Sequence, residues 1–238
     1  MEILHGETTP QRSYNNKVLE TIRAHHPLLP GSVYLFLKRV FDLAITLITL
    51  PVWMPLLGLC ALLIKLDSPE GPAFFTQLRT GKGGRRFKMH KFRTMVEDAE
   101  GLKADFAHLN ELRWPDFKIK NDPRITRVGR VLRHLRLDEL PQLFNVLRGQ
   151  MRLIGPRPER PHFVSELSAN MPDYPNRLKV PPGITGLAQV EKQYDSSVDD
   201  VRTKLYYDLF YVKNRCRLLD FKILVKTIDV VLRGRGAR

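Results

Sequence analysis

Residues 136–159, RLDELPQLFNVLRGQMRLIGPRPE, decide how the rest of the chain is interpreted. Two adjacent carboxylates, Asp138 and Glu139, precede apolar residues that recur at intervals of three and four, the spacing of an amphipathic helix. Pro141 falls in the first turn of that helix, where its missing N–H is tolerated, and Gly149 follows the last apolar residue as a stop. The pattern therefore predicts a short helix with Asp138 as its N-cap.

The surroundings of this acidic pair are basic. The nearby arginines are Arg133, Arg136, Arg148, Arg152, Arg157 and Arg160. A helix N-terminus carries unpaired N–H groups and a partial positive charge, which keep an aspartate ionised. Such a carboxylate can bind a divalent cation through oxygen, or attack an electrophilic phosphorus. An Asp before an apolar helix is also commonly only its cap. This stretch alone leaves both interpretations open.

The composition points to a polyanionic partner. The chain has 238 residues, 43% of them apolar, which is enough for one or two domains with a real core. Its formal net charge is +14 and its pI is near 10.0. That surplus suits nucleic acid, an anionic bilayer or phosphorylated substrates. The two cysteines, Cys60 and Cys216, indicate neither a disulfide framework nor a zinc site, which fits a reducing, cytoplasm-facing setting.

Residues 43–64 form a run of 22 residues without a charge. As a straight helix this run would be about 33 Å long, enough to cross a hydrocarbon core of about 30 Å. Pro51 and Pro55 lie near its middle, where each removes a backbone hydrogen bond and bends the helix. Basic residues flank both ends, and positive charge prefers the cytoplasmic side of a membrane. We therefore predict a re-entrant helical hairpin at about residues 40–66; a spanning helix and a buried core helix are the alternatives.

Residues 1–32 are polar and lack the layout of a signal peptide, so we expect an N-terminal extension there. After the apolar run, two strand-like segments between residues 74 and 95 flank the glycines of residues 81–84, which predicts a β-hairpin. The spacing of a P-loop is absent. Lys91 and Arg93, at the end of the second strand, could face a phosphate or belong to a solvated or lipid-facing surface.

Residues 96–120 mix acids, bases and aromatic side chains without a clean period. Trp114 and Phe117 favour an interfacial helix, because both side chains prefer the headgroup zone of a membrane. Residues 125–137 then predict an amphipathic basic helix that leads into the Asp138 turn.

The C-terminal third contains a loop and two helical patterns. Residues 181–186, PPGITG, predict a rigid loop whose glycines serve either close ligand approach or plain structure. Residues 198–212 predict a helix that carries Asp208 among aromatic residues. Residues 218–232 alternate apolar and basic side chains, which predicts an amphipathic helix that lies on an anionic membrane or packs against the core.

Taken together, these segments resemble a known family, the bacterial sugar transferases, which are monotopic phosphoglycosyl transferases. The resemblance covers about residues 33–233, in the family's order. The motifs that carry it are KRVFDLAITLITLPVWMPLLGLCALLIKLDSPEGPAFF (38–75), KFRTM (91–95), LRLDELPQLFNVLRGQMRLIGPRPE (135–159), PGITGLAQV (182–190) and KLYYDLFYVKN (204–214). One departure is that Leu50, and not a serine, precedes Pro51, so we expect the membrane break to rely on the prolines without a local hydroxyl. Larger relatives carry further segments ahead of this region, and we expect this chain to be the minimal catalytic form.

The resemblance implies a reaction that primes polysaccharide or glycoconjugate synthesis. A sugar 1-phosphate passes from a UDP-sugar to a polyprenyl (undecaprenyl) phosphate, and UMP is released. Asp138 corresponds to the family's nucleophile, which forms a covalent phosphosugar intermediate. Glu139 corresponds to the second acid, a metal ligand or acid/base group, and Mg²⁺ held by both acids is implied. The sugar is not encoded in a motif that we can place.

Further residues are assigned through the same resemblance. Lys91, Arg93, Arg157, Glu159 and Asp208 are expected to bind substrate or phosphate, Arg157 through bidentate geometry. The implied fold is α+β and mostly helical, with a re-entrant membrane hairpin, a small β-hairpin and interfacial amphipathic helices. Residues 33–238 form the catalytic domain in this interpretation.

The implied location is the cytoplasmic face of the bacterial inner membrane, where anionic lipids are further partners and nucleic acid is not; a homodimer is left open. Three rivals remain at this stage: a nucleic-acid-binding module, which gives the acidic pair no use; a polytopic transferase without a covalent intermediate, which needs several spanning segments; and a non-catalytic membrane scaffold.

Overall fold

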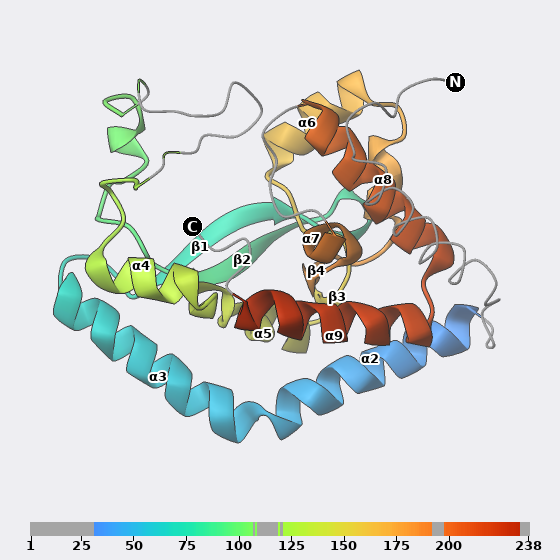
Figure 1. Ribbon diagram of the computed structural model, residues 1–238, viewed down its shortest axis with the longest axis horizontal. Coiled ribbons are helices and arrows are strands. Elements are labelled where there is room, and N and C mark those ends of the chain that lie inside the picture. The colour runs from blue at the N-terminus through green and yellow to red at the C-terminus, as the bar shows by residue number, and fades with distance from the viewer. Residues whose placement is uncertain (1–30, 107, 109–118, 120, 192–197, 234–238) are drawn as a thin grey trace.

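The computed structural model describes residues 31–106, 108, 119, 121–191 and 198–233 (Figure 1). The described part is mostly helical, with a pair of two-stranded sheets, as the predicted α+β class requires. The predicted extension, apart from residues 31 and 32, and the segment with Trp114 and Phe117 lie outside the described residues. The α-helices are α2 (Gly31–Ile48), α3 (Leu50–Asp67), α4 (Arg127–His134), α5 (Gln142–Leu147), α6 (Pro161–Asn170), α7 (Leu187–Glu191), α8 (Val198–Asn214) and α9 (Arg217–Leu232). The strands are β1 (Phe74–Thr80), β2 (Arg86–Phe92), β3 (Arg152–Ile154) and β4 (Gly183–Thr185).

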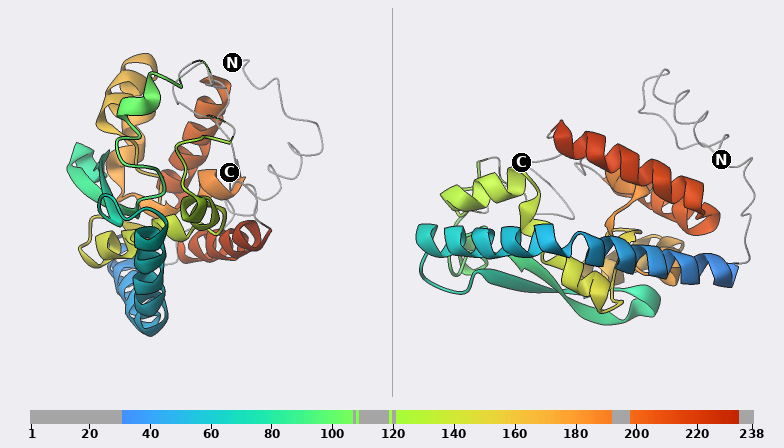
Figure 2. Two further views of the ribbon diagram at one scale, coloured as in Figure 1. Left: turned by 90° about the vertical axis from the view of Figure 1, so that its left-hand side faces the viewer. Right: turned by 90° about the horizontal axis from the view of Figure 1, so that it is seen from below.

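The apolar run is divided between two helices. Helices α2 and α3 meet at Thr49 and form a wide V along the lower edge of the molecule in Figure 1. Seen from below, they follow one line, so the bend lies in the plane of Figure 1 (Figure 2). Pro51 occupies the first turn of α3 and Pro55 lies inside it. The break therefore falls where the prolines predicted a bend, immediately before Pro51.

Local hydroxyl groups take part in this bend, so the expectation that the prolines act without one is wrong. Thr49 Oγ1 donates to the carbonyl of Ile45 at 2.7 Å, and Thr46 Oγ1 donates to the carbonyl of Asp42 at 2.7 Å. A threonine hydroxyl that bonds back to the preceding turn commonly bends a helix. The expectation rested on Leu50, directly before Pro51, whereas the hydroxyls lie two and five residues before the proline.

Trp53 fastens the bend to the rest of the molecule. Its Nε1–H donates to the carbonyl of Thr46 at 2.9 Å, across the junction of α2 and α3. Its ring meets that of Phe144 edge to face, with 5.4 Å between the ring centroids. Trp53 and Phe144 belong to a cluster that packs α3 against α4 and α5. The bend is thus anchored on the helix that follows the acidic pair.

Most of the surface of α3 is uncovered. This helix is long and apolar enough to cross a membrane, and only 22% of its residues are buried. That low burial argues against a helix of the core. The exposed apolar side chains of α2 and α3 include Phe36, Phe41, Ile48, Val52, Leu59, Leu62 and Leu66.

The predicted β-hairpin is confirmed. Strands β1 and β2 are antiparallel, with Phe74 opposite Phe92 and Thr80 opposite Arg86. Gly83 and Gly84 have φ angles of 64° and 78°, a left-handed conformation that favours glycine. The glycine cluster therefore forms the turn, as predicted.

The helix after the acidic pair begins later than predicted. Asp138 and Glu139 lie in a 3₁₀ turn, η4 (Leu137–Glu139), and α5 begins only after Pro141. The prediction of Asp138 as a helix N-cap is therefore wrong. A 3₁₀ turn followed by proline has the same apolar spacing over one turn as the start of an α-helix. Periodicity therefore could not distinguish a 3₁₀ turn from an α-helical turn here. Gly149, with φ 77°, ends α5 as predicted.

A second sheet was missed. Strand β3 pairs in parallel with β4, with Arg152 opposite Gly183 and Ile154 opposite Thr185. A Cβ atom on Gly183 would lie 2.1 Å from the backbone nitrogen of Gly155. The glycines predicted to permit close approach thus permit contact between two backbone segments. Helices α7, α8 and α9 surround this sheet, and the predicted helices at residues 198–212 and 218–232 are confirmed.

Candidate functional site

The acidic pair is presented by a strained turn. Thr126 caps α4 by accepting a hydrogen bond from the Gly129 N–H at 3.0 Å. After α4 ends, Arg136 adopts a left-handed conformation, with φ 57° and ψ 18°, which is uncommon for a residue with a side chain. This residue reverses the chain so that Asp138 and Glu139 face strand β2. Non-glycine residues in this conformation are concentrated at functional sites.

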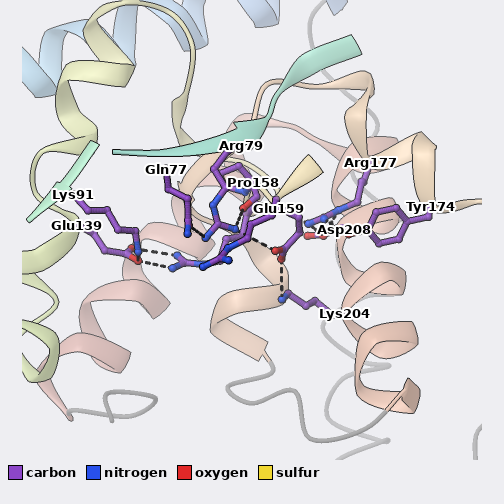
Figure 3. A network of polar contacts seen from close by, with 12 residues as sticks. Gln77, Arg79, Lys91, Glu139, Pro158, Glu159, Tyr174, Arg177, Lys204 and Asp208 are labelled. Atoms are coloured by element: carbon purple, nitrogen blue, oxygen red, sulfur yellow. Dashed lines mark hydrogen bonds and ion pairs between the residues drawn. The ribbon is translucent and has the colours of Figure 1, made fainter. Parts of the chain in front are cut away.

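Glu139 is held by two cations from different elements. Lys91 Nζ of β2 lies 3.0 Å from Glu139 Oε1, and Arg157 Nη1 lies 3.2 Å from Oε2 (Figure 3). The second Arg157 Nη group also donates to Oε1, so the arginine binds the carboxylate in the bidentate manner. Burial alone would raise the pKa of Glu139, but Arg157 and Lys91 outweigh it and hold that pKa well below its usual range. Glu139 is therefore an ionised group.

Asp138 lies beside this cluster and has the opposite pKa shift. Burial raises the pKa of Asp138, Lys91 opposes that rise, and the neighbouring charge of Glu139 adds to it. Arg133 also lowers this pKa and is itself oriented by Thr94, whose Oγ1 accepts from Arg133 Nε at 2.8 Å. The carboxylate of Asp138 accepts no hydrogen bond from the part of the chain that the structure describes. Asp138 thus has its oxygens available.

Glu159 forms a second charged centre next to the first. Its Oε2 lies 3.3 Å from Arg79 Nη1, and its Oε1 lies 3.4 Å from Lys204 Nζ. Arg79 also donates to the carbonyl of Pro158 at 3.0 Å. Burial tends to raise the pKa of Glu159, but Lys204, Arg177 and Arg79 lower it to about 2. A small pocket beside Glu159 is lined by residues that include Gly81, Pro156, Arg157 and Val180.

Asp208 closes the line of charges shown in Figure 3. Its Oδ2 accepts from Arg177 Nε at 3.0 Å and from Arg177 Nη2 at 2.6 Å. Arg177 also donates to the hydroxyl of Tyr174 at 2.7 Å and to the backbone carbonyl of Arg157 at 2.8 Å. Asp208 is 2% exposed. It therefore orients Arg177, which in turn supports the backbone of Arg157.

Arg93 is placed apart from these clusters. Its Nη2 donates to the carbonyl of Ser68 at 2.5 Å, at the end of α3. Its buried Nε and Nη1 have no hydrogen-bond partner among the described residues. The structure thus brings together five predicted site residues: Lys91, Asp138, Glu139, Arg157 and Glu159. Asp208 is connected to them through Arg177, and Arg93 lies outside the site.

Four basic residues of the site were given no role from the sequence: Arg79, Arg133, Arg177 and Lys204. Arg133 precedes Asp138 by five residues, and its proximity was the only available signal. The other three reach the site from β1, from the 3₁₀ segment η5 (Tyr174–Lys179) and from α8. Nothing in the local sequence reports contacts over such separations.

The capacity for a metal rests on the acidic pair. No group of three or more histidine, cysteine, aspartate or glutamate side chains suited to a metal lies within the described residues. Mg²⁺ is commonly bound by one or two carboxylates together with substrate phosphates and water. The available oxygens of Asp138 fit that requirement, while those of Glu139 are engaged by Lys91 and Arg157.

Comparison with known proteins gives the family. The model of the bacterial sugar transferase family matches residues 33–234. A UDP-N-acetylgalactosamine-undecaprenyl-phosphate N-acetylgalactosaminephosphotransferase of Aeromonas hydrophila is 46% identical over 211 residues, 89% of this chain and 47% of that protein. An undecaprenyl-phosphate galactose phosphotransferase of Salmonella typhimurium is 45% identical over 207 residues, 85% of this chain and 42% of that protein.

A third relative has a length closer to that of this chain. The UDP-glucose:undecaprenyl-phosphate glucose-1-phosphate transferase of Caulobacter vibrioides is 40% identical over 216 residues, 90% of this chain and 76% of that protein. The chain thus spans less than half of the length of the first two relatives and about three quarters of the third. On the match over residues 33–234, the chain belongs to the bacterial sugar transferase family.

Proposed function

We propose that this protein transfers a sugar 1-phosphate from a UDP-sugar to undecaprenyl phosphate and releases UMP. The observation that carries the proposal is Asp138, whose available carboxylate lies beside Lys91, Arg133 and Arg157 in a chain of this family. The names of the relatives above support the acceptor, because each contains undecaprenyl phosphate. They differ in the sugar, so the donor of this chain is a matter for experiment.

The reaction balances as two displacements at one phosphorus. An Asp138 oxygen forms a bond to the sugar-linked phosphorus, and the bond from that phosphorus to the bridging oxygen breaks, so UMP leaves with the electron pair. An oxygen of undecaprenyl phosphate then attacks the same phosphorus and breaks its bond to Asp138. The carboxylate is regenerated, which gives ping-pong kinetics.

The surrounding residues have distinct roles in this proposal. Lys91 and Arg157 bind the diphosphate oxygens, and Glu139 keeps both cations in place when no substrate is bound. Glu159 holds Arg79 and Lys204, and Asp208 orients Arg177, which lines the small pocket beside Glu159. Asp138 would hold Mg²⁺ through its free oxygens, and Glu139 would serve as a second ligand if substrate drew Arg157 away. When bound, Mg²⁺ would neutralise the diphosphate and stabilise UMP as a leaving group.

Apolar surfaces support a position at the membrane. The uncovered faces of α2 and α3 fit a re-entrant hairpin in the hydrocarbon layer, because both helices bend away from a straight crossing at Thr49. Helix α9 exposes an apolar stripe whose members are Leu218, Phe221, Val225, Ile228 and Val231. Such a stripe on a basic protein suits the interface of an anionic bilayer. The cytoplasmic face of the inner membrane is the place where a soluble nucleotide sugar can meet a lipid phosphate.

Nucleotide release tests the proposal. Purified protein, Mg²⁺ and undecaprenyl phosphate are incubated with UDP-N-acetylgalactosamine, UDP-galactose, UDP-glucose and further UDP-sugars, and UMP and UDP are measured separately. Asp138→Asn is assayed beside Asp105→Asn, which removes an exposed carboxylate distant in sequence from the site. We expect UMP from one donor, abolished by Asp138→Asn and retained by Asp105→Asn.

Other outcomes would contradict the proposal in different ways. Release of UDP would mean ordinary glycosyl transfer and would remove the role of Asp138 as nucleophile. The absence of both nucleotides with every donor would favour the non-catalytic scaffold. Without lipid acceptor, a burst of UMP stoichiometric with enzyme is expected for the covalent mechanism, because Asp138 can complete only the first displacement.

A further inference from the structure

We propose that Arg39, on the membrane helix α2, is a positioning residue for the acidic pair. This inference rests on the proposed function for the role of Asp138. The Arg39 guanidinium crosses to the end of α5, where Nη1 donates to the carbonyl of Val146 at 2.6 Å and Nη2 donates to the carbonyl of Leu147 at 3.0 Å. The partners are more than 100 residues away in sequence. A contact of this kind joins the membrane anchor directly to the catalytic body.

Arg39 supplies side-chain donors at the end of α5. The Val146 carbonyl also accepts from the Gly149 N–H at 3.0 Å, so Arg39 is a second donor there. The last turn of a helix leaves carbonyls without N–H groups from the same helix, and a cationic side chain can bind them, as Arg39 does at Leu147. Helix α5 has only 6 residues, so its own hydrogen bonds hold it weakly. Its length is about 9 Å, which means that its capped end is close to the turn with Asp138 and Glu139. A shift of α5 would therefore move that turn.

Asn145 connects the same helix to the strand that carries Lys91. This residue of α5 is fully buried. Its Oδ1 accepts from the backbone N–H of His90 at 3.0 Å, and its Nδ2 donates to the carbonyl of Lys88 at 2.8 Å. Lys91 follows His90 on β2 and contacts Glu139 at 3.0 Å. These contacts form a continuous chain from Arg39 through α5 and β2 to Glu139.

Helix α2 provides a fixed base for Arg39. Lys38 Nζ lies 2.8 Å from Asp220 Oδ2 of α9, and the hydroxyl of Tyr34 donates to the same oxygen at 2.7 Å. On the next turn, Asp42 Oδ1 accepts from the Leu153 N–H at 3.4 Å. The polar face of α2 is thus fastened to the catalytic body on both sides of Arg39. The anchor helix is then part of the scaffold of the site and does more than hold the protein at the bilayer.

The test compares Arg39→Gln and Arg39→Lys with Arg217→Gln. Arg217 is an exposed arginine at the start of α9, so its replacement removes the same charge near the membrane without touching α5. Full-length protein in nanodiscs is assayed for UMP release and, independently, for hydrogen exchange. We expect Arg39→Gln to lower kcat by about tenfold or more while KM for the UDP-sugar changes less than about twofold, because misplacement of reacting groups acts on the chemical step. Arg39→Lys restores part of kcat, because an ammonium group can reach one of the two carbonyls.

Hydrogen exchange tests the positioning role of Arg39 even if the protein lacks the proposed activity. Arg39→Gln is expected to speed exchange in the peptides that cover residues 142–148 and 88–91, and Arg217→Gln is not. Unchanged exchange in those peptides would overturn the inference. A fall in kcat that matches the loss of folded or membrane-bound protein, with no rescue by lysine, would also overturn it. Wild-type protein that releases no UMP would instead contradict the proposed function, and the exchange comparison would still stand.

Discussion

At the scale of single residues, the site separates two neighbouring acids. Arg157 and Lys91 hold the pKa of Glu139 well below its usual range, whereas burial raises that of Asp138. Acids whose environments shift their pKa values in opposite directions commonly have different roles. Glu139 is the permanent anion that organises cations, and Asp138 is the more basic carboxylate, which agrees with its proposed role as a nucleophile toward phosphorus.

Glu159→Gln gives a pH-dependent prediction. Neighbouring cations lower the pKa of Glu159 from 4.5 to about 2, so its charge stabilises the fold above pH 4.5 and that contribution is lost as the pH falls toward 2. We expect the variant to have a free energy of unfolding about 3 kcal/mol below that of wild type at pH 7, with less than half of that difference at pH 3. Urea unfolding in detergent micelles measures both values. A difference that stays constant between these pH values would contradict the assigned contacts.

The buried pair of Asp208 and Arg177 predicts a large loss of stability. Their side chains are 2% and 4% exposed, so removal of one charge leaves the other buried without its ion-pair partner. We expect Asp208→Asn to lower the free energy of unfolding by about 3 to 5 kcal/mol. Glu100→Gln is the matched control, because its pair with Arg160 is exposed and should contribute about 1 kcal/mol or less. Equal effects of the two variants in thermal unfolding would refute the difference in burial.

The sequence was sufficient to predict the residues whose chemistry is local. Asp138 and Glu139 are adjacent in one stretch, and the family resemblance added Lys91, Arg157 and Glu159, all of which the structure gathers. It could not predict that Asp208 would contact Arg177, because that contact depends on how α8 packs on η5. Arg93 shows that a residue close in sequence to a site residue need not belong to the site. It is two residues from Lys91 yet turns to Ser68, because strand β2 ends between them.

At the scale of elements, a glycine and an arginine from another helix meet at the end of α5. Gly149 follows this helix with φ 77°, and the carbonyls that Arg39 binds lie immediately before it. We expect Gly149→Ala to lower the free energy of unfolding by about 1 kcal/mol, because alanine in a left-handed conformation is strained. Gly58→Ala, in a helical position with nothing within 4 Å of the added Cβ, should be neutral or stabilising. Thermal unfolding of both variants provides the measurement, and equal destabilisation would contradict the assigned conformation.

Periodicity predicted elements well where one face is apolar over several turns. The helices at residues 198–212 and 218–232 are examples, whereas the hairpin was predicted from the glycines of its turn. Periodicity failed over single turns, where η4 imitates the start of a helix. The parallel pair β3 and β4 was missed for a related reason: each strand has 3 residues, and their pairing joins segments about 30 residues apart. Short elements of this kind are determined by tertiary contacts.

At the scale of the whole molecule, the two arms of the V are fastened to one body. In the first half of α2, the Tyr34 hydroxyl donates to Asp220 at 2.7 Å and Lys38 pairs with the same carboxylate at 2.8 Å. At the far end of α3, Asp67 Oδ2 accepts from the Val128 N–H of α4 at 2.9 Å. Each arm is about 27 Å long, and neither end can leave the catalytic body without breaking these contacts. A body that lies on one side of the bilayer requires both ends of the V on that side.

Cysteine labelling tests this topology. Val33→Cys and Glu70→Cys mark the two ends, and Asp105→Cys marks the catalytic body, each in a background with Cys60→Ala and Cys216→Ala. An impermeant maleimide is applied to spheroplasts and to inverted membrane vesicles. All three cysteines are expected to react only in inverted vesicles, because in the proposed topology both arms return to the cytoplasmic face. Reaction of residues 33 and 70 from opposite sides would establish a spanning helix, and it would require that the Lys38–Asp220 or Asp67–Val128 contact is broken in the membrane.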